Sequence, residues 1–155
     1  MAYPTAAVAN VFIEKAINGE IPDLTPMKLQ KLIFYAQSWH LKIYDEPLVD
    51  EFFAKWPYGP VIPSLYHDVK NYGSKPVTTL ISSLINTDPG FAIVTQKVPS
   101  DDRQTLNLID KIISVYGNLR GTQLSYLTHQ EGTAWSKAPE GSSVIDNQLL
   151  KDCIK

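Results

Sequence analysis

The sequence predicts a mainly α protein. We expect a single compact domain over residues 1–155, with about six helices around a central helix and one or two short β segments. Apolar residues recur at three- and four-residue spacing in several separate stretches, which is the period of a helix. The β-rich stretches are short and do not alternate with helices, as a doubly wound sheet would require. With 155 residues, 44% of them hydrophobic, the chain can bury the core of one domain.

The central helix is expected to begin at Thr25 and Pro26 and to run to about residue 43. The Thr25 hydroxyl can accept a hydrogen bond from a free N–H of the first turn, and proline suits the first helical position. The residues predicted to share one face are Leu29, Leu32, Ile33, Ala36, His40 and Ile43. Aromatic residues lie off this stripe, so we expect the helix to be covered on more than one side.

Around it, a first helix is predicted over residues 4–18, ended by Gly19. After the central helix, residues 49–56 are predicted to form a short edge strand. Residues 57–63 contain three prolines, which disfavour a helix interior and a central strand. We therefore expect an ordered loop of aromatic and proline residues there.

A short helix is predicted over residues 64–72. Residues 74–90 are compatible with a helical turn or with a strand, and they end in the turn signal Asp88-Pro89-Gly90. Residues 91–95 are rich in β-forming side chains and predict a short strand.

Three further helices are expected in the last third of the chain. The first is predicted to begin at Ser100 or Asp101, with Leu106, Ile109, Ile113 and Tyr116 on its core face. A shorter helix is expected from Thr122. The last helix is expected to begin at Ser143, where Asp146 three residues later forms a weak capping box.

Charge and cysteine content exclude several classes of protein. The formal net charge is −2 and the pI about 5.9, which argues against nucleic-acid binding. The one cysteine, Cys153, excludes a disulfide framework and a cysteine-rich zinc site. The sequence shows no stretch of about 20 apolar residues and no basic, apolar leader, so we expect a cytoplasmic protein.

No catalytic pattern stands out, so we expect no enzymatic activity, cofactor or metal. The sequence has no P-loop, no dinucleotide-binding glycine pattern and no nucleophile elbow. A metal-dependent enzyme would have to use His40, His67, His129 and Glu131, which lack metal-ligand spacing. That alternative stays open, although a hydrogen bond to a backbone carbonyl is the expected role of His40.

Aromatic residues close to glycine and proline are the candidate partner-binding surface. The residues we select are Trp56, Tyr58, Pro60, Tyr66 and Trp135. Tryptophan and tyrosine are common anchors of protein interfaces, and rigid prolines reduce the entropic cost of binding. The alternative is that these rings fill the gaps between short helices.

Three stretches together resemble the Panacea domain, the SocA-like antitoxin domain also labelled phage-associated or GepA-like. They are residues 26–40, residues 56–63 with Tyr66, and residues 124–132 with Trp135. In this family a proline often precedes the tryptophan, whereas here Thr133-Ala134 does. The resemblance implies a mostly helical, non-catalytic cytoplasmic protein of a bacterium, phage or prophage.

The resemblance also implies a partner, a cognate protein toxin usually encoded beside the antitoxin. We expect toxin specificity to lie in residues 74–100 or in the C-terminal tail. One alternative is a phage or mobile-element protein of the same fold that acts on another host protein. Direct inhibition and delivery to a protease both stay open, as does the oligomeric state.

Overall fold

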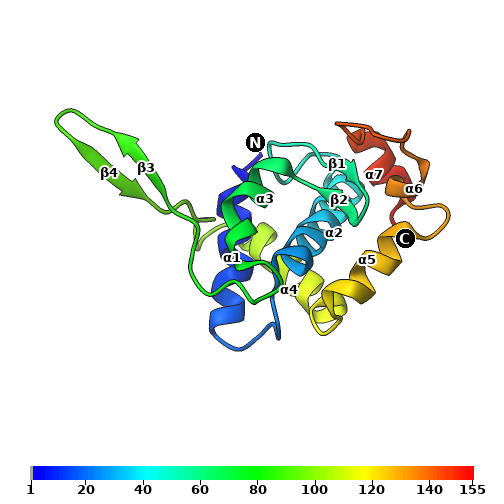
Figure 1. Ribbon diagram of the computed structural model, residues 1–155, viewed down its shortest axis with the longest axis horizontal. Helices are drawn as coiled ribbons and strands as arrows, with labels where there is room; N and C mark the ends of the chain where they lie inside the picture. The colour runs from blue at the N-terminus through cyan, green and yellow to red at the C-terminus, as the bar shows by residue number, and fades with distance from the viewer. Residues whose placement is uncertain (1) are drawn as a thin grey trace.

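Helix α2 (Pro26–Tyr44) runs through the middle of the molecule, and the other helices pack around it (Figure 1). The structure is a computed structural model, and it describes residues 2–155. The helices that contact α2 are α1 (Thr5–Ile17), α3 (Pro63–Val69), α4 (Arg103–Tyr116), α5 (Gly121–His129) and α7 (Asn147–Cys153). The prediction of a mainly α fold around a central helix is therefore confirmed.

The start of α2 follows its sequence signals, because the Thr25 hydroxyl accepts from the Lys28 N–H at 3.2 Å and Pro26 is the first helical residue. Of the predicted stripe, the residues that are buried are Leu29, Leu32, Ile33, Ala36 and His40. The prediction is wrong for Ile43, which is 56% exposed. It lies in the last turn, where Ile43 and Val115 line an open groove between α2 and α4.

Two buried glutamine side chains of α2 form hydrogen bonds with the backbone of residues 48, 49 and 62, which lie outside the strands. The Gln37 Oε1 accepts from the backbone N–H groups of Leu48 and Val49 at 2.7 and 3.0 Å. Gln30 makes a pair of bonds with the backbone of Ile62, at 3.0 and 2.9 Å. These bonds satisfy buried backbone groups that would otherwise lack a partner.

Residues 57–63 were predicted to be a loop, and that prediction is wrong for part of the segment. Strands β1 (Ala54–Trp56) and β2 (Gly59–Val61) form an antiparallel hairpin in which Lys55 lies opposite Pro60. The Lys55 N–H points away from β2 and donates to the Ser142 carbonyl at 2.9 Å. Pro60 is therefore tolerated, because its position needs no N–H toward β1.

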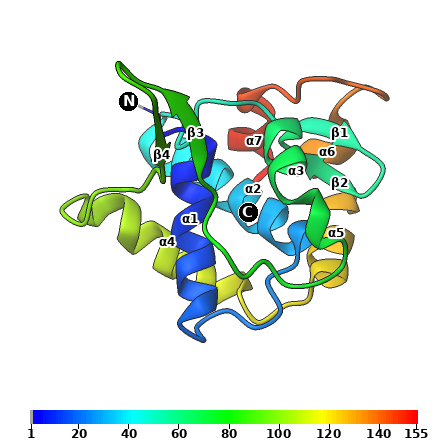
Figure 2. The ribbon, with the colours of Figure 1, turned by 60° about the vertical axis from the view of Figure 1, so that its left-hand side comes forward.

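Helix α3 continues into a 3₁₀ turn, η1 (Lys70–Tyr72), and together they span the predicted short helix. The ambiguous segment after it becomes extended chain and then strand β3 (Ser83–Asn86), which pairs with β4 (Phe91–Val94). This second hairpin projects from the body of the molecule as an arm (Figures 1 and 2).

Helices α4 and α7 begin later than predicted, whereas α5 begins at Gly121, one residue before the predicted Thr122. Helix α4 is capped by Asp102, whose carboxylate accepts from the Thr105 N–H, and not by Ser100 or Asp101. Its most buried apolar residues are Leu108, Ile109 and Ile112, so the predicted core face is rotated. The short α6 (Ala134–Lys137) follows α5.

Helix α7 is capped by Asp146 itself, so the predicted start at Ser143 is wrong. Residues 143–145 instead run extended past the first hairpin, where the Ile145 N–H donates to the Phe53 carbonyl at 2.7 Å. No helix within residues 2–155 is long and apolar enough to cross a membrane.

Candidate partner-binding surfaces

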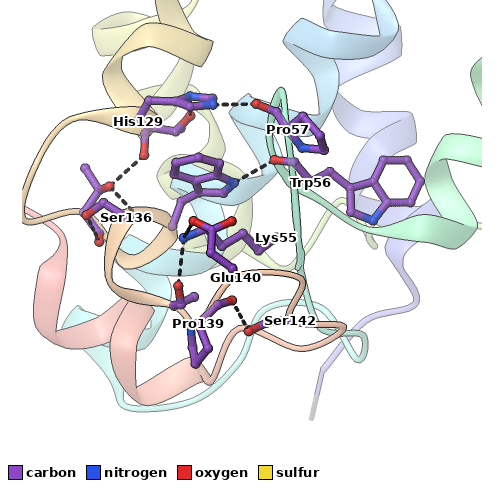
Figure 3. A network of polar contacts seen from close by, with 12 residues as sticks. Lys55, Trp56, Pro57, His129, Ser136, Pro139, Glu140 and Ser142 are labelled. Carbon is purple, nitrogen blue, oxygen red and sulfur yellow. Dashed lines mark hydrogen bonds and ion pairs between the residues drawn. The ribbon is translucent and has the colours of Figure 1, made fainter.

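Side chains of the α5–α6 segment contact the β1–β2 hairpin along one side (Figure 3). The His129 ring lies between two backbone carbonyl oxygens, with Nε2 2.7 Å from Pro57 and Nδ1 2.6 Å from Ser125. The Ser125 hydroxyl donates to the Tyr58 carbonyl at 2.7 Å. The Trp135 indole N–H donates to the Trp56 carbonyl at 2.8 Å. Three side-chain contacts from α5 and α6 thus fix the turn of the hairpin, and the His129 Nδ1 contact with Ser125 orients the ring within α5.

Trp135 is also enclosed by its neighbours. Its ring lies 4.0 Å from the His129 ring, and the Lys55 ammonium lies 4.5 Å from its centroid. That ammonium donates to the Ala138 carbonyl at 2.7 Å and lies 3.5 Å from the exposed Glu140 carboxylate (Figure 3). Cation–π attraction and the indole hydrogen bond therefore tie α6 to the hairpin.

A groove of about 160 Å³ lies on another side of the hairpin, between α2 and α3. Its lining includes Met27, Lys31, Trp56, Tyr58, Val61 and Tyr66. The Trp56 and Tyr66 rings meet edge to face at 5.0 Å, while Tyr58 is 69% exposed. The groove is therefore mainly apolar and aromatic, and open to a partner.

The structure brings together three of the five residues predicted to bind a partner. Trp56, Tyr58 and Tyr66 line the groove. Pro60 is buried in β2, and Trp135 is half-buried in the contacts that support the hairpin. The last two thus lie beneath the surface that the other three form.

Within residues 2–155, Lys31 is the one charged residue that lines the groove, and no sequence pattern indicated it. Its side chain is 1% exposed, and its ammonium has one hydrogen bond, a long one of 3.4 Å to the Pro60 carbonyl. Burial lowers the pKa of Lys31 from 10.5 to about 8. Lysine is usually exposed, so only the packing of α2 on β2 reveals this buried cation.

The arm presents a second apolar surface. In the β3–β4 register Leu84 lies opposite Ile93 and Asn86 opposite Phe91, so the three apolar side chains share one face. Leu84, Phe91 and Ile93 are 69%, 70% and 77% exposed. We call this set the arm face. It lies within residues 74–100, the segment in which the sequence analysis expected toxin specificity.

A buried asparagine anchors the base of the arm. The Asn10 side chain of α1 donates to the carbonyls of Ile81 and Gln96 at 3.0 and 2.9 Å. Its Oδ1 accepts from the Ile81 N–H at 2.7 Å. The arm therefore leaves the body from a fixed position.

The histidines have ordinary surroundings. His40 is buried, and its Nδ1 lies 2.5 Å from the Glu46 carbonyl, which confirms its predicted role. His67 is exposed on α3 next to Tyr66. Among the described residues, no three His, Cys, Asp or Glu side chains are grouped so that they could hold a metal ion.

Comparisons with known proteins agree with the resemblance noted in the sequence. Residues 29–136 match the family described as "Antitoxin SocA-like, Panacea domain". The chain is 31% identical over 151 residues to Antitoxin SocA of Caulobacter vibrioides (strain NA1000 / CB15N), covering 96% of this chain and 77% of that protein. No solved structure matches significantly. With a central helix, a supported hairpin and a family match over most of its length, the chain belongs to the SocA-like antitoxin family with a Panacea domain.

Proposed function

We propose that this chain is a non-enzymatic antitoxin that binds a cognate protein toxin, encoded beside it, and neutralises it in the cytoplasm. Family membership supports the antitoxin role. The observation that carries the binding role is the arm face, where three large apolar side chains remain uncovered by the chain.

Physical chemistry favours a partner over this face. A two-stranded hairpin on its own is only marginally stable in water, and exposed clusters of large apolar side chains mark interaction sites. The arm projects away from the helices, so a bound toxin could contact it from either side (Figure 1). Both edges of the hairpin also offer backbone groups that a strand of the toxin could pair with.

The aromatic groove supplies a second contact in this proposal. Trp56, Tyr58 and Tyr66 would touch the toxin, since they line the groove. Pro60 and Trp135 would act by holding the hairpin that presents those rings, since their own surfaces are largely covered. Rigid presentation lowers the entropy lost on binding.

Co-expression with each neighbouring reading frame tests the proposal. We expect one neighbour to arrest growth alone and to become harmless when this chain is present. The arm variant Leu84→Thr/Phe91→Thr/Ile93→Thr keeps β-forming residues but removes the apolar face, so it should fail to rescue growth.

A matched control replaces three exposed apolar residues elsewhere, in Ile17→Ala/Val115→Ala/Tyr126→Ala. We expect this control to rescue growth as the wild type does. Absence of toxicity and rescue for every neighbour would contradict the antitoxin role, and rescue by the arm variant would contradict the role of the arm.

A further inference from the structure

We infer that the aromatic groove is a receptor for a carboxylate attached to an apolar group, with Lys31 as the residue that binds the carboxylate. The occupant is a segment of the toxin in which an aromatic or large aliphatic side chain lies next to a carboxylate. The identity of this occupant rests on the proposed function, whereas the chemistry of the groove does not.

The first argument is that the Lys31 ammonium lacks partners. Its one hydrogen bond, to Pro60, is long at 3.4 Å, and none of the ion pairs within residues 2–155 includes it. An ammonium has three N–H donors, so two of them have no acceptor among the described residues. A buried, under-coordinated cation is costly unless an anion joins it.

Lys55 of strand β1 is a nearby buried lysine whose ammonium does have its hydrogen-bond partners. Lys55 is also buried, but its ammonium has the Ala138 carbonyl at 2.7 Å, the Glu140 carboxylate at 3.5 Å and the face of Trp135. Lys31 has none of these kinds of partner except one distant carbonyl. The difference indicates that the missing acceptor comes from outside the chain.

The second argument is the composition of the groove lining. The Lys31 side chain lines the groove together with Met27, Val61 and the three aromatic rings. At Gly59 a Cβ would lie 2.7 Å from the Lys31 Cε and 3.1 Å from its Nζ, so the hairpin can pass this close only because residue 59 is glycine. The groove thus combines apolar walls with one cation, which complements an apolar group that carries a negative charge.

The third argument is electrostatic. Burial alone lowers the pKa of Lys31, and no carboxylate of the chain raises it. An anion bound at Nζ would favour the charged form and raise the pKa again. Ligand binding and the titration of Lys31 are therefore linked, and each can report the other.

The test needs no toxin. We would titrate the protein with 3-phenylpropionate and with the neutral 3-phenylpropionamide, and follow the Lys31 side chain and the groove rings by NMR. We expect the carboxylate to bind at least tenfold more tightly and to raise the pH midpoint of Lys31. The inference would be overturned if the two probes bound equally well. It would also be overturned if millimolar carboxylate changed no NMR signal, or only signals of residues outside the groove.

Two variants sharpen the test. Lys31→Met keeps the volume of the side chain but should abolish the preference for carboxylate over amide. Lys28→Met removes another lysine of the same helix, whose side chain is also buried but lies outside the groove, and it should keep that preference. If Lys31→Met still prefers the carboxylate to the amide, Lys31 does not bind the carboxylate. If a variant does not fold, the titration of Lys31 in the wild type, with and without the carboxylate, still decides the question.

The toxin then tests the occupant separately. We expect Lys31→Met to bind the toxin at least tenfold more weakly than Lys28→Met does. Equal toxin affinity of the two variants would overturn the assignment of the toxin as occupant. A toxin that binds normally while the groove ignores carboxylates would refute this inference but leave the antitoxin function standing.

Discussion

Replacing Lys31 with methionine should stabilise the protein, although it removes a polar contact. The pKa of Lys31 falls from 10.5, the value for an unfolded chain, to about 8 in the fold. A depression of this size corresponds to about 3 kcal/mol of penalty for keeping the amine charged in the folded state. The lost 3.4 Å hydrogen bond offsets little of that. We therefore expect Lys31→Met to raise the free energy of unfolding by about 2–3 kcal/mol at pH 7.

The sign of the pH dependence follows from the same shift. Between pH 8 and 10.5 the unfolded chain binds more protons at Lys31 than the folded chain does, so stability rises with pH over this window. The full penalty applies below pH 8. By about pH 9.5 the advantage of Lys31→Met should have shrunk by about 2 kcal/mol.

Urea unfolding of the two proteins, followed by circular dichroism from pH 7 to about pH 9.5, measures this difference. Burial raises the pKa of Tyr3 to about 12 and also raises the pKa of Tyr35. Both tyrosines are present in the wild type and in Lys31→Met, so their contributions cancel in the difference in stability between the two proteins. Lys75→Met, at an exposed site, is the matched control and should change little. The reasoning fails if Lys31→Met is no more stable than the wild type at pH 7, or if its advantage is independent of pH.

Three other substitutions test contacts that support the fold, the groove and the arm. Gly59→Ala should destabilise the fold by more than about 2 kcal/mol, because φ is +120° and the new Cβ would meet Lys31. Thermal unfolding should show a smaller loss of stability when Lys31→Ala is added to Gly59→Ala, since the clash with the lysine side chain is then removed. Gln37→Leu should cost about 2–4 kcal/mol in urea unfolding, since two buried backbone N–H groups lose their acceptor, and no loss would contradict the role of Gln37. Asn10→Ala should speed amide hydrogen exchange of the Ile81 N–H by at least about tenfold, and unchanged exchange there would mean that Asn10 does not anchor the arm.

The central helix could be predicted because independent local signals agree. The Thr25 cap, Pro26 and the helical period of apolar residues all place the helix in the same register. Its end was less predictable, because burial of Ile43 depends on how far α4 covers the last turn. The cap of α4 was misplaced because Ser100, Asp101 and Asp102 are all capable caps.

Strand β1 lies within the predicted edge strand over residues 49–56, but its pairing with β2 could not be predicted from local sequence. The prolines of the hairpin favour a loop, and the strand pairing depends on contacts made by residues far along the chain. The Lys55 N–H needs the Ser142 carbonyl, and the turn needs His129 and Trp135. Such support is tertiary, and it overrides local propensity.

The candidate surfaces were partly visible in the sequence. Aromatic residues near proline and glycine indicated Trp56, Tyr58 and Tyr66, which the structure gathers at one groove. Lys31 gave no signal, since a charged residue between apolar ones on a helix ordinarily reaches solvent. The segment of β3 was ambiguous and that of β4 was predicted as a strand, but the exposed apolar face of the arm appears only when the strand register is known.

Hydrogen–deuterium exchange of the chain, free and bound to its toxin, tests the central proposal most directly. If the arm binds the toxin, the amides of β3 and β4 should exchange at least about tenfold more slowly in the complex, while the exposed far end of α1 around Ile17 should be unaffected. A stable complex in which exchange over β3 and β4 is unchanged would contradict the proposal that the arm captures the toxin.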